Sequence, residues 1–353
     1  MTPRTSLRPG IGAALVAALL FGAGTPLAKL LLAATDPWLL AGLLYAGSGL
    51  GLTLWRLLRP PVERARLGRG DGRWLAAAVL AGGVVAPVLL MWGLAHMPAA
   101  AAALLLNAET VFTVVIAWLA FGENVGRRVV AGMLAIVAGA VLLSWPREAA
   151  MGSLLPPLAV LGACAAWGLD NNLTRKVSLA DATLIASIKG LAAGATNLAL
   201  ALALGAAWPS AGRIGGALVV GFLAYGVSLA LFVVALRHLG AARTGGYFGV
   251  APFFGAVVAT LLLGEPVTLA LLAAGALMAI GVWLHVSERH AHAHRHEPLD
   301  HEHEHAHDDH HRHDHDHADG AVAVGPHTHR HRHAPTQHSH PHTPDAHHRH
   351  RHG

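Results

Sequence analysis

Charge is scarce in this chain. Asp, Glu, Lys and Arg make up only 13% of its 353 residues, whereas 54% are hydrophobic, which is too little charge for an ordinary soluble protein. Cys164 is the sole cysteine, so no intrachain disulfide and no cysteine-based metal site can form. Histidine is rare outside one segment, because 24 of the 27 histidines lie from His290 onward. These shortages exclude soluble, disulfide-stapled and cysteine-ligated zinc proteins.

In place of charge the chain has a series of apolar runs near twenty residues long. A helix rises about 1.5 Å per residue, so about twenty residues cross a hydrocarbon core roughly 30 Å thick. Breaking the runs at clusters of Arg, Pro, Gly and Asp predicts an all-α membrane protein with ten transmembrane helices. Their expected bounds are 11–34, 37–57, 74–95, 98–121, 125–145, 155–174, 181–207, 214–237, 241–263 and 267–286.

The short loops predict an orientation. With the N-terminus inside, the inner loops hold fourteen Lys and Arg residues, and the outer loops hold two, Arg147 and Arg213. This asymmetry places both termini in the cytoplasm of a multi-pass protein, and we expect the bacterial inner (plasma) membrane. The basic residues of the body set this topology, so the lipid bilayer is the expected partner and no nucleic acid is expected.

The chain also repeats itself. Residues 96–100 align with 238–242 at an offset of 142, and the same offset pairs Phe112 with Phe254 and Gly139 with Gly281. Two five-helix halves result, at 11–145 and 153–286. An odd number of crossings per half forces the halves into opposite orientations, which is the inverted-repeat plan of secondary transporters.

After residue 286 the composition changes to His, Asp, Arg and Pro without apolar periodicity. We expect residues 287–353 to form a disordered His-rich cytoplasmic tail. Its imidazoles and carboxylates suit Zn, Ni, Co or Cu, with candidate ligands at His292, His294, His301, His303, His305, His313, His315 and His317. Residues 301–305 match the letters of a zinc-protease motif, but that motif needs a packed helix, so the match is accidental.

Several local patterns resemble a known family. Phe21-Gly22 is followed by Lys29 eight residues after the aromatic, and Trp167-Gly168 is followed by Arg175 at the same spacing. One helix in each half ends in Phe-Gly-Glu or Leu-Gly-Glu, before a glycine-rich helix. Residues 11–286 therefore resemble the EamA-type members of the drug/metabolite transporter (DMT) superfamily. The resemblance implies ten transmembrane helices and the transport of small metabolites, commonly outward.

Glu109 is the principal candidate for a residue of the transport pathway, because it lies near the middle of an apolar span. A charge at the bilayer centre costs about 2.5 kcal/mol or more unless it finds water or a partner. Glu109 could bind a proton or a substrate amine, or it could pair with a buried cation such as Lys29 or Lys189. Lys29 and Lys189 are themselves pathway candidates, although either could reach an interface instead.

Uncharged side chains complete the predicted pathway. Asn107 and Asn171 could hydrogen-bond a substrate, or could simply join helices. Trp92, Trp167 and Tyr247 could line a cavity and stack on an organic substrate, or could serve packing and interfacial anchoring.

Three functional hypotheses follow. The first is a secondary transporter, expected to be an exporter, that moves a small organic metabolite by alternating access, with no cofactor required. The second is a divalent transition-metal exporter whose tail gathers the ion. The third is a membrane protein that buffers or senses metal and transports nothing. No catalytic constellation is found, so an enzyme is not expected.

Overall fold

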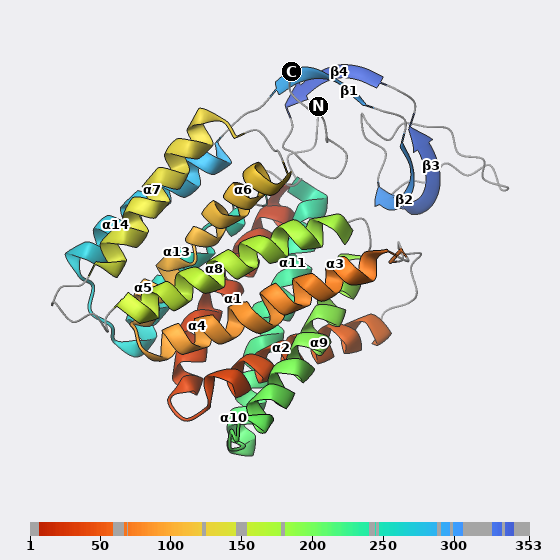
Figure 1. The fold of residues 1–353 in the computed structure, drawn as a ribbon. Coiled ribbons are helices and arrows are strands. Elements are labelled where there is room, and N and C mark those ends of the chain that lie inside the picture. Colours follow the sequence, from red (N-terminus) through yellow and green to blue (C-terminus); the bar gives the residue numbers. More distant parts are fainter. Residues whose placement is uncertain are drawn as a thin grey trace.

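The computed structural model describes most of the helical body and four short segments of the tail (Figure 1). The described residues are 7–58, 67–68, 70–121, 125–145, 154–177, 181–239, 244, 247–287, 291–296, 299–305, 327–333 and 336–341.

Helices occupy all five spans expected in the first half. One helical stretch, from 71 to 95, changes from α to π geometry and back, and another is interrupted at Leu106 and Asn107. The elements are α1 (Leu7–Leu32), α2 (Pro37–Leu58), α3 (Asp71–Ala78), η1 (Val79–Val85), α4 (Ala86–Ala95), α5 (Ala99–Leu105), α6 (Ala108–Phe121) and α7 (Arg127–Ser144).

The second half has a matching series of elements. A π segment again interrupts a long helix, since the Ser228 N–H bonds to the Leu223 carbonyl five residues back. In the first half the Ala86 N–H bonds to Ala81 in the same way. The elements are α8 (Leu155–Thr174), η3 (Arg175–Val177), α9 (Ala182–Ala203), α10 (Ala211–Gly221), η4 (Phe222–Val227), α11 (Ser228–Leu239), α13 (Ala251–Leu263) and α14 (Leu269–Val286).

Among the residues that the structure describes, eight helical stretches are long and apolar enough to cross a membrane. Two expected spans are not among the eight. The span expected at 155–174 is α8, whose hydropathy is lowered by three consecutive polar residues, 170–172. The span expected at 241–263 contains α13, which has only 13 residues. The eight are Gly10–Leu32, Pro37–Leu58, Asp71–Ala95, Ala99–Ala120, Arg127–Ser144, Thr183–Ala203, Ala211–Ala235 and Leu269–Val286.

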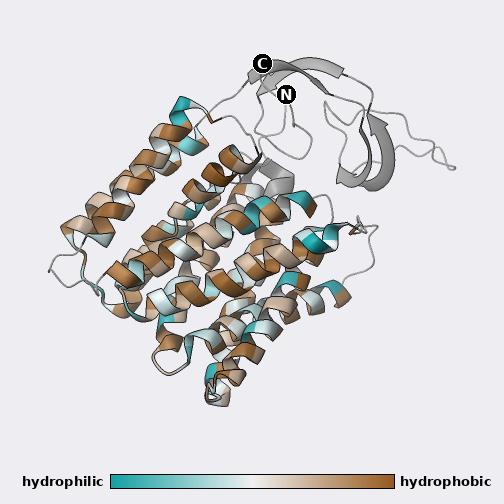
Figure 2. Ribbon diagram, viewed as in Figure 1, coloured by the Kyte–Doolittle hydropathy of each residue, from teal (hydrophilic) through white to brown (hydrophobic). Residues whose placement is uncertain are grey.

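The surface of the bundle is apolar along the length of the helices. Large side chains such as Leu119, Leu134, Leu261 and Leu272 are exposed, and in Figure 2 hydrophobic residues cover most of each helix while hydrophilic ones gather near helix ends. A surface of this kind is covered by lipid in a membrane protein.

Six helix pairings make the largest contributions to the described bundle. α2 packs on α9, and α7 packs on α14 beside it (Figure 1). α1 packs on α11 and α13, whereas α8 packs on α4 and α6. The closest approaches use small residues, which let backbones come together in lipid. At the α1–α13 crossing a Cβ atom on Gly22 would lie 2.9 Å from the Gly255 nitrogen, so a larger residue does not fit there.

The tail differs from the sequence expectation in its described part. Antiparallel strands pair β1 (Ala291–His296) with β4 (Thr336–Pro341), and β2 (Leu299–His305) with β3 (His327–His333). Composition alone predicted no regular structure there. The alternation of residue types at a period of two, as in His-Glu-His-Glu-His, is compatible with extended backbone, and the composition argument ignored it.

Candidate functional site: a polar cluster between α6, α8 and the π segment η1

Glu109 lies in the first turn of α6, directly after the interruption at Leu106 and Asn107. One carboxylate oxygen accepts a hydrogen bond from the Asn171 side-chain amide of α8, over 2.8 Å. The same amide group lies 3.2 Å from the Thr113 hydroxyl, one turn further along α6. Within the described part of the chain, Glu109 forms no ion pair. Glu109 is therefore a membrane-embedded carboxylate held only by neutral groups.

Asn171 is exposed although it lies within the bundle. The lipid-facing side of α8 is marked by the exposed residues Leu158 and Leu169. Asn171 lies two positions after Leu169, and two positions along an α-helix correspond to a rotation of about 200° around its axis. Asn171 therefore points away from the face that carries Leu169. Asn171 instead shares a face with Trp167, one turn earlier, whose indole nitrogen contacts η1. Its exposure is therefore toward the interior between α6, α8 and η1.

A salt bridge lies next to Glu109. Lys189 of α9 donates to both carboxylate oxygens of Asp170 in α8, over 2.6 and 2.7 Å, and the Asp170 side chain is only 8% exposed. The Thr174 hydroxyl donates to Asp170 as well, over 2.9 Å. The expectation that Glu109 could form an ion pair with Lys189 is therefore wrong, because the Lys189 ammonium group forms its ion pair with Asp170.

The π segment supplies carbonyl groups to the same cluster. The N–H of Ala86 bonds to the carbonyl of Ala81, so the N–H of the following residue would be expected to bond to the carbonyl of Gly82 or Gly83. The following residue is Pro87, which has no N–H. Side chains satisfy the two freed carbonyls. Gly82 accepts hydrogen bonds from Tyr45 over 2.7 Å and from Trp167 over 2.9 Å, and Gly83 accepts one from Asn197 over 2.8 Å.

Aromatic rings continue from Tyr45 toward the second half of the chain. The Tyr45 ring stacks on Tyr225 of η4 with centroids 5.7 Å apart. Tyr225 meets Phe21 of α1 edge to face at 5.8 Å, and Phe21 in turn contacts Phe248 at 5.4 Å. The polar cluster is thus bordered by an aromatic wall that joins both halves.

Lys29 lies elsewhere, at the ends of α1 and α4. Its ammonium group donates to the backbone carbonyls of Leu94, Ala95 and Met97. These carbonyls belong to the C-terminal end of α4, where a helix lacks its own donors. The expected pairing of Lys29 with Glu109 is therefore wrong as well.

The remaining predicted pathway residues are not brought into contact with Glu109. Asn107 is buried and donates to the Leu104 carbonyl, 2.9 Å away. Trp92 is 38% exposed and packs against His96, and Tyr247 packs beside Ala14 and Ala235.

Five of the eight predicted metal ligands of the tail lie in its described strands. His313, His315 and His317 lie outside the described residues. His292 and His294 lie in β1, and His301, His303 and His305 lie in β2.

Three residues of the cluster were missed by sequence reasoning, namely Tyr45, Gly82 and Asp170. The sequence does contain an indication of the role of Asp170. An acidic residue within one expected span and Lys189 within the next could form a buried ion pair. Pro87 could have indicated the freed carbonyls of Gly82 and Gly83.

The interrupted helices, the lipid-compatible surface and the interior polar cluster define a polytopic membrane transport protein. The sequence profile of the EamA-like transporter family matches residues 8–145 and again 154–287. The chain belongs to the EamA-like transporter family, which is part of the drug/metabolite transporter superfamily.

Individual proteins are also similar to this chain. A protein of Methanothermobacter thermautotrophicus described as an uncharacterized transporter is 28% identical over 289 residues, which are 76% of this chain and 84% of the relative. The uncharacterized protein PA1977 of Pseudomonas aeruginosa is 30% identical over 236 residues, covering 63% of this chain and 74% of its own length. A solved crystal structure at 19% identity matches the fold with a TM-score of 0.56, over 80% of this chain and 97% of its own.

Proposed function

We propose that this protein is a secondary transporter that exports a small organic metabolite by alternating access. Glu109, Asn171 and the aromatic wall form its substrate site. The single observation that carries this proposal is a carboxylate inside the bundle that forms no ion pair among the described residues and is hydrogen-bonded by a neutral amide. Retaining such a group costs free energy, so a functional role, such as binding a substrate or a proton, offsets that cost.

We propose ten transmembrane segments in two inverted repeats. Close contacts that exchange partners between the halves support this proposal. A Cβ atom on Gly22 would lie 2.9 Å from the Gly255 nitrogen, and one on Gly168 would lie 2.9 Å from the nitrogen of Thr113. Gly168 is the counterpart of Gly22 in the repeat, and Gly255 is the counterpart of Thr113.

A second crossing has the same relationship. A Cβ atom on Gly139 of α7 would lie 3.0 Å from the Ala274 carbonyl oxygen, and one on Gly281 of α14 would lie 2.7 Å from that of Gly132. The offset of 142 exchanges Gly139 with Gly281 and Gly132 with Ala274. Contacts that exchange in this way are what a twofold axis between the halves produces, and rocking of one half against the other would open the site alternately.

The loops and the tail complete the proposal. The excess of basic residues in alternate loops supports an inner-membrane location with both termini in the cytoplasm. The tail would bind Zn, Ni, Co or Cu as an accessory. The strand register supports this accessory role, because it sets His301 opposite His331 and His303 opposite His329. Within the described residues no group of three metal-ligating side chains lies together, so metal as the transported species has less support.

A two-stage experiment tests the proposed site. The full chain, purified in detergent, is first screened by thermal shift against a metabolite library, because a ligand of the folded state raises the apparent stability. Hits are then followed as flux into proteoliposomes. Glu109→Gln should lower flux at least tenfold and remove the thermal shift.

Asp36→Asn is the matched control. Asp36 caps α2 through the N–H groups of Trp38 and Leu39, and an asparagine retains this capping ability. The control variant should transport as the parent does. Equal flux in the parent and in Glu109→Gln would remove Glu109 from the site, and the absence of any hit or flux would overturn the transport proposal itself.

A further inference from the structure

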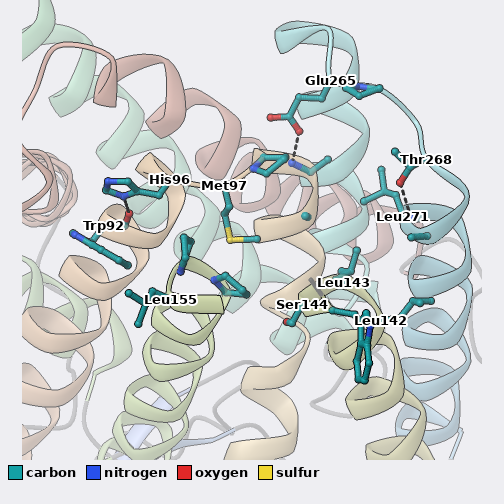
Figure 3. Close-up of a pocket in the computed structure, with 18 residues that line it drawn as sticks. Trp92, His96, Met97, Leu142, Leu143, Ser144, Leu155, Glu265, Thr268 and Leu271 are labelled. Atoms are coloured by element: carbon teal, nitrogen blue, oxygen red, sulfur yellow. Dashed lines mark hydrogen bonds between the residues drawn. The ribbon is translucent and has the colours of Figure 1, made fainter. Parts of the chain in front are cut away.

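A cavity lies at the end of the bundle where α4 turns into α5 (Figure 3). Its volume is about 670 Å³, which is within the range of small-molecule sites. Helices α7 and α14 form one wall, and the start of α8 and the 96–98 turn form the other. Glu109, Asn171 and Asp170 do not line it, so it is separate from the proposed substrate site.

The lining of this cavity is mainly apolar. Leu142, Leu143, Leu155, Pro157 and Leu271 contribute hydrocarbon surface. Glu265 also lines it, but each of its carboxylate oxygens accepts a backbone N–H from the start of α5, over 2.6 and 2.8 Å. Its negative charge is therefore already engaged by a helix N-terminus, which makes the cavity a poor site for an organic cation.

The polar groups left in the cavity are two hydroxyls and one imidazole. The buried Ser144 hydroxyl has no hydrogen-bond partner among the described residues. The Thr268 oxygen accepts from the Leu271 N–H, so its own hydrogen remains available. His96 must donate from Nδ1 to the Trp92 carbonyl, 2.8 Å away, and a neutral ring then has an acceptor at Nε2. Two hydroxyl donors and one acceptor suit ester and hydroxyl groups.

The cavity also lies at a seam of the fold. α7 and α14 pack extensively on each other but only lightly on α5 and α6. The cavity is situated between this helix pair and the body, at helix ends where Trp92 and Trp145 line it. Tryptophan is enriched at the level of lipid headgroups, where the glycerol esters of phospholipids also lie.

We propose that this cavity binds one phospholipid of the adjacent leaflet. Its ester region would face Ser144 and Thr268, and an acyl chain would lie along Leu142, Leu155 and Leu271. The lipid fills the seam and connects the α7–α14 pair to the body. The proposal needs only the membrane location of the protein, and it stands whether or not the chain transports a metabolite.

Native mass spectrometry of the full chain tests this proposal. The protein is delipidated in mild detergent and then mixed with dioleoyl phosphatidylethanolamine. Ala101→Trp and Ala270→Leu place bulk into the cavity from α5 and from α14. Leu134→Trp is the matched control, because residue 134 is 64% exposed on α7 and does not line the cavity.

One retained phospholipid is expected in the parent and in the control, with retention at least tenfold lower in the two filled variants. If Ala101→Trp loses its helical circular dichroism signal, the milder Ala270→Leu decides the result. Equal retention in all four proteins would overturn the proposal. So would no retention in the parent, or a bound mass that corresponds to detergent or to a second copy of the chain.

Discussion

Lys29 and Glu265 hold the two ends of one turn from opposite halves of the chain. Lys29 donates to carbonyls at the end of α4, including those of Ala95 and Met97. Glu265 accepts the N–H groups of Ala99 and Ala100 at the start of α5. The C-terminal end of a helix is partly negative and its N-terminal end is partly positive. A cation at the first and an anion at the second are therefore both stabilising. Both residues therefore fix the α4–α5 connection.

Loss of either residue should lower stability. Lys29→Met removes three hydrogen bonds made by a charged donor, and each such bond contributes about 1.5–3 kcal/mol. Glu265→Gln keeps an acceptor for one N–H but removes the charge, so its cost should be smaller, about 1 kcal/mol. Thermal unfolding in detergent measures both effects. A transport defect in Lys29→Met at unchanged stability would contradict the structural role and return Lys29 to the pathway.

The Asp170–Lys189 pair should show strong coupling. Asp170→Asn leaves Lys189 unpaired with only 18% of its side chain exposed, and removing one member of a buried pair costs about 3–5 kcal/mol. The double variant Asp170→Asn/Lys189→Met removes both charges of the pair and leaves neither one without its partner, so it should be more stable than either single variant. A double-mutant cycle on thermal unfolding measures the coupling. Strictly additive losses would show that the two groups do not interact in the membrane.

Gly82 should not tolerate a side chain. A Cβ atom at this position would overlap the Asp170 carboxylate, so Gly82→Ala must displace Asp170 from Lys189. The nearby Gly83→Ala is not a neutral comparison, because its Cβ would lie 2.6 Å from Ala193. Gly72→Ala in α3 is a better control, since nothing lies within 4 Å of its Cβ position. Gly82→Ala should lower the unfolding temperature by several degrees, whereas Gly72→Ala should change it little.

The sequence predicted where helices exist better than how they are interrupted. Apolar runs located each helical stretch, because membrane insertion requires them. The π turns at η1 and η4 leave no mark in hydropathy, so they were not predicted. Glu109 was predicted as a candidate from its position in an apolar run, but which side chains contact its carboxylate depends on helix rotation. That rotation is set by close contacts such as Gly168 on Thr113, which composition does not reveal.

Tyr45 and Trp167 should partly substitute for each other. Both donate to the Gly82 carbonyl, and one remaining donor still satisfies that oxygen. Tyr45→Phe and Trp167→Phe should each cost about 1 kcal/mol in hydrogen bonding, while the double variant should cost more than the sum because the carbonyl is then buried without a partner. Thermal unfolding of the three variants measures this. An additive double variant would indicate that water replaces the lost donors.

The ion pair between Arg56 and Asp181 should make the free energy of unfolding vary with pH in the acid range. The Arg56 guanidinium lies 2.8 Å from the Asp181 carboxylate, which also caps α9 through the Thr183 and Leu184 N–H groups. Burial by itself raises the pKa of Asp181, but hydrogen bonds from Thr183, Arg56 and Leu184 favour the carboxylate and leave its pKa below the usual value. A lowered pKa in the folded state means that the carboxylate adds stability at higher pH.

That contribution is complete above the usual aspartate pKa of about 4, and it is lost as the pH falls through the lowered pKa of the folded protein. Asp181→Asn retains a capping oxygen but loses the charge opposite Arg56, so it should be less stable than the parent above about pH 5. The difference in unfolding temperature should shrink below about pH 4. Asp36→Asn, which changes a capping aspartate without an ion pair among the described residues, is the control. A difference for Asp181→Asn that stayed constant down to about pH 3 would mean that capping, rather than the charge facing Arg56, carries the effect.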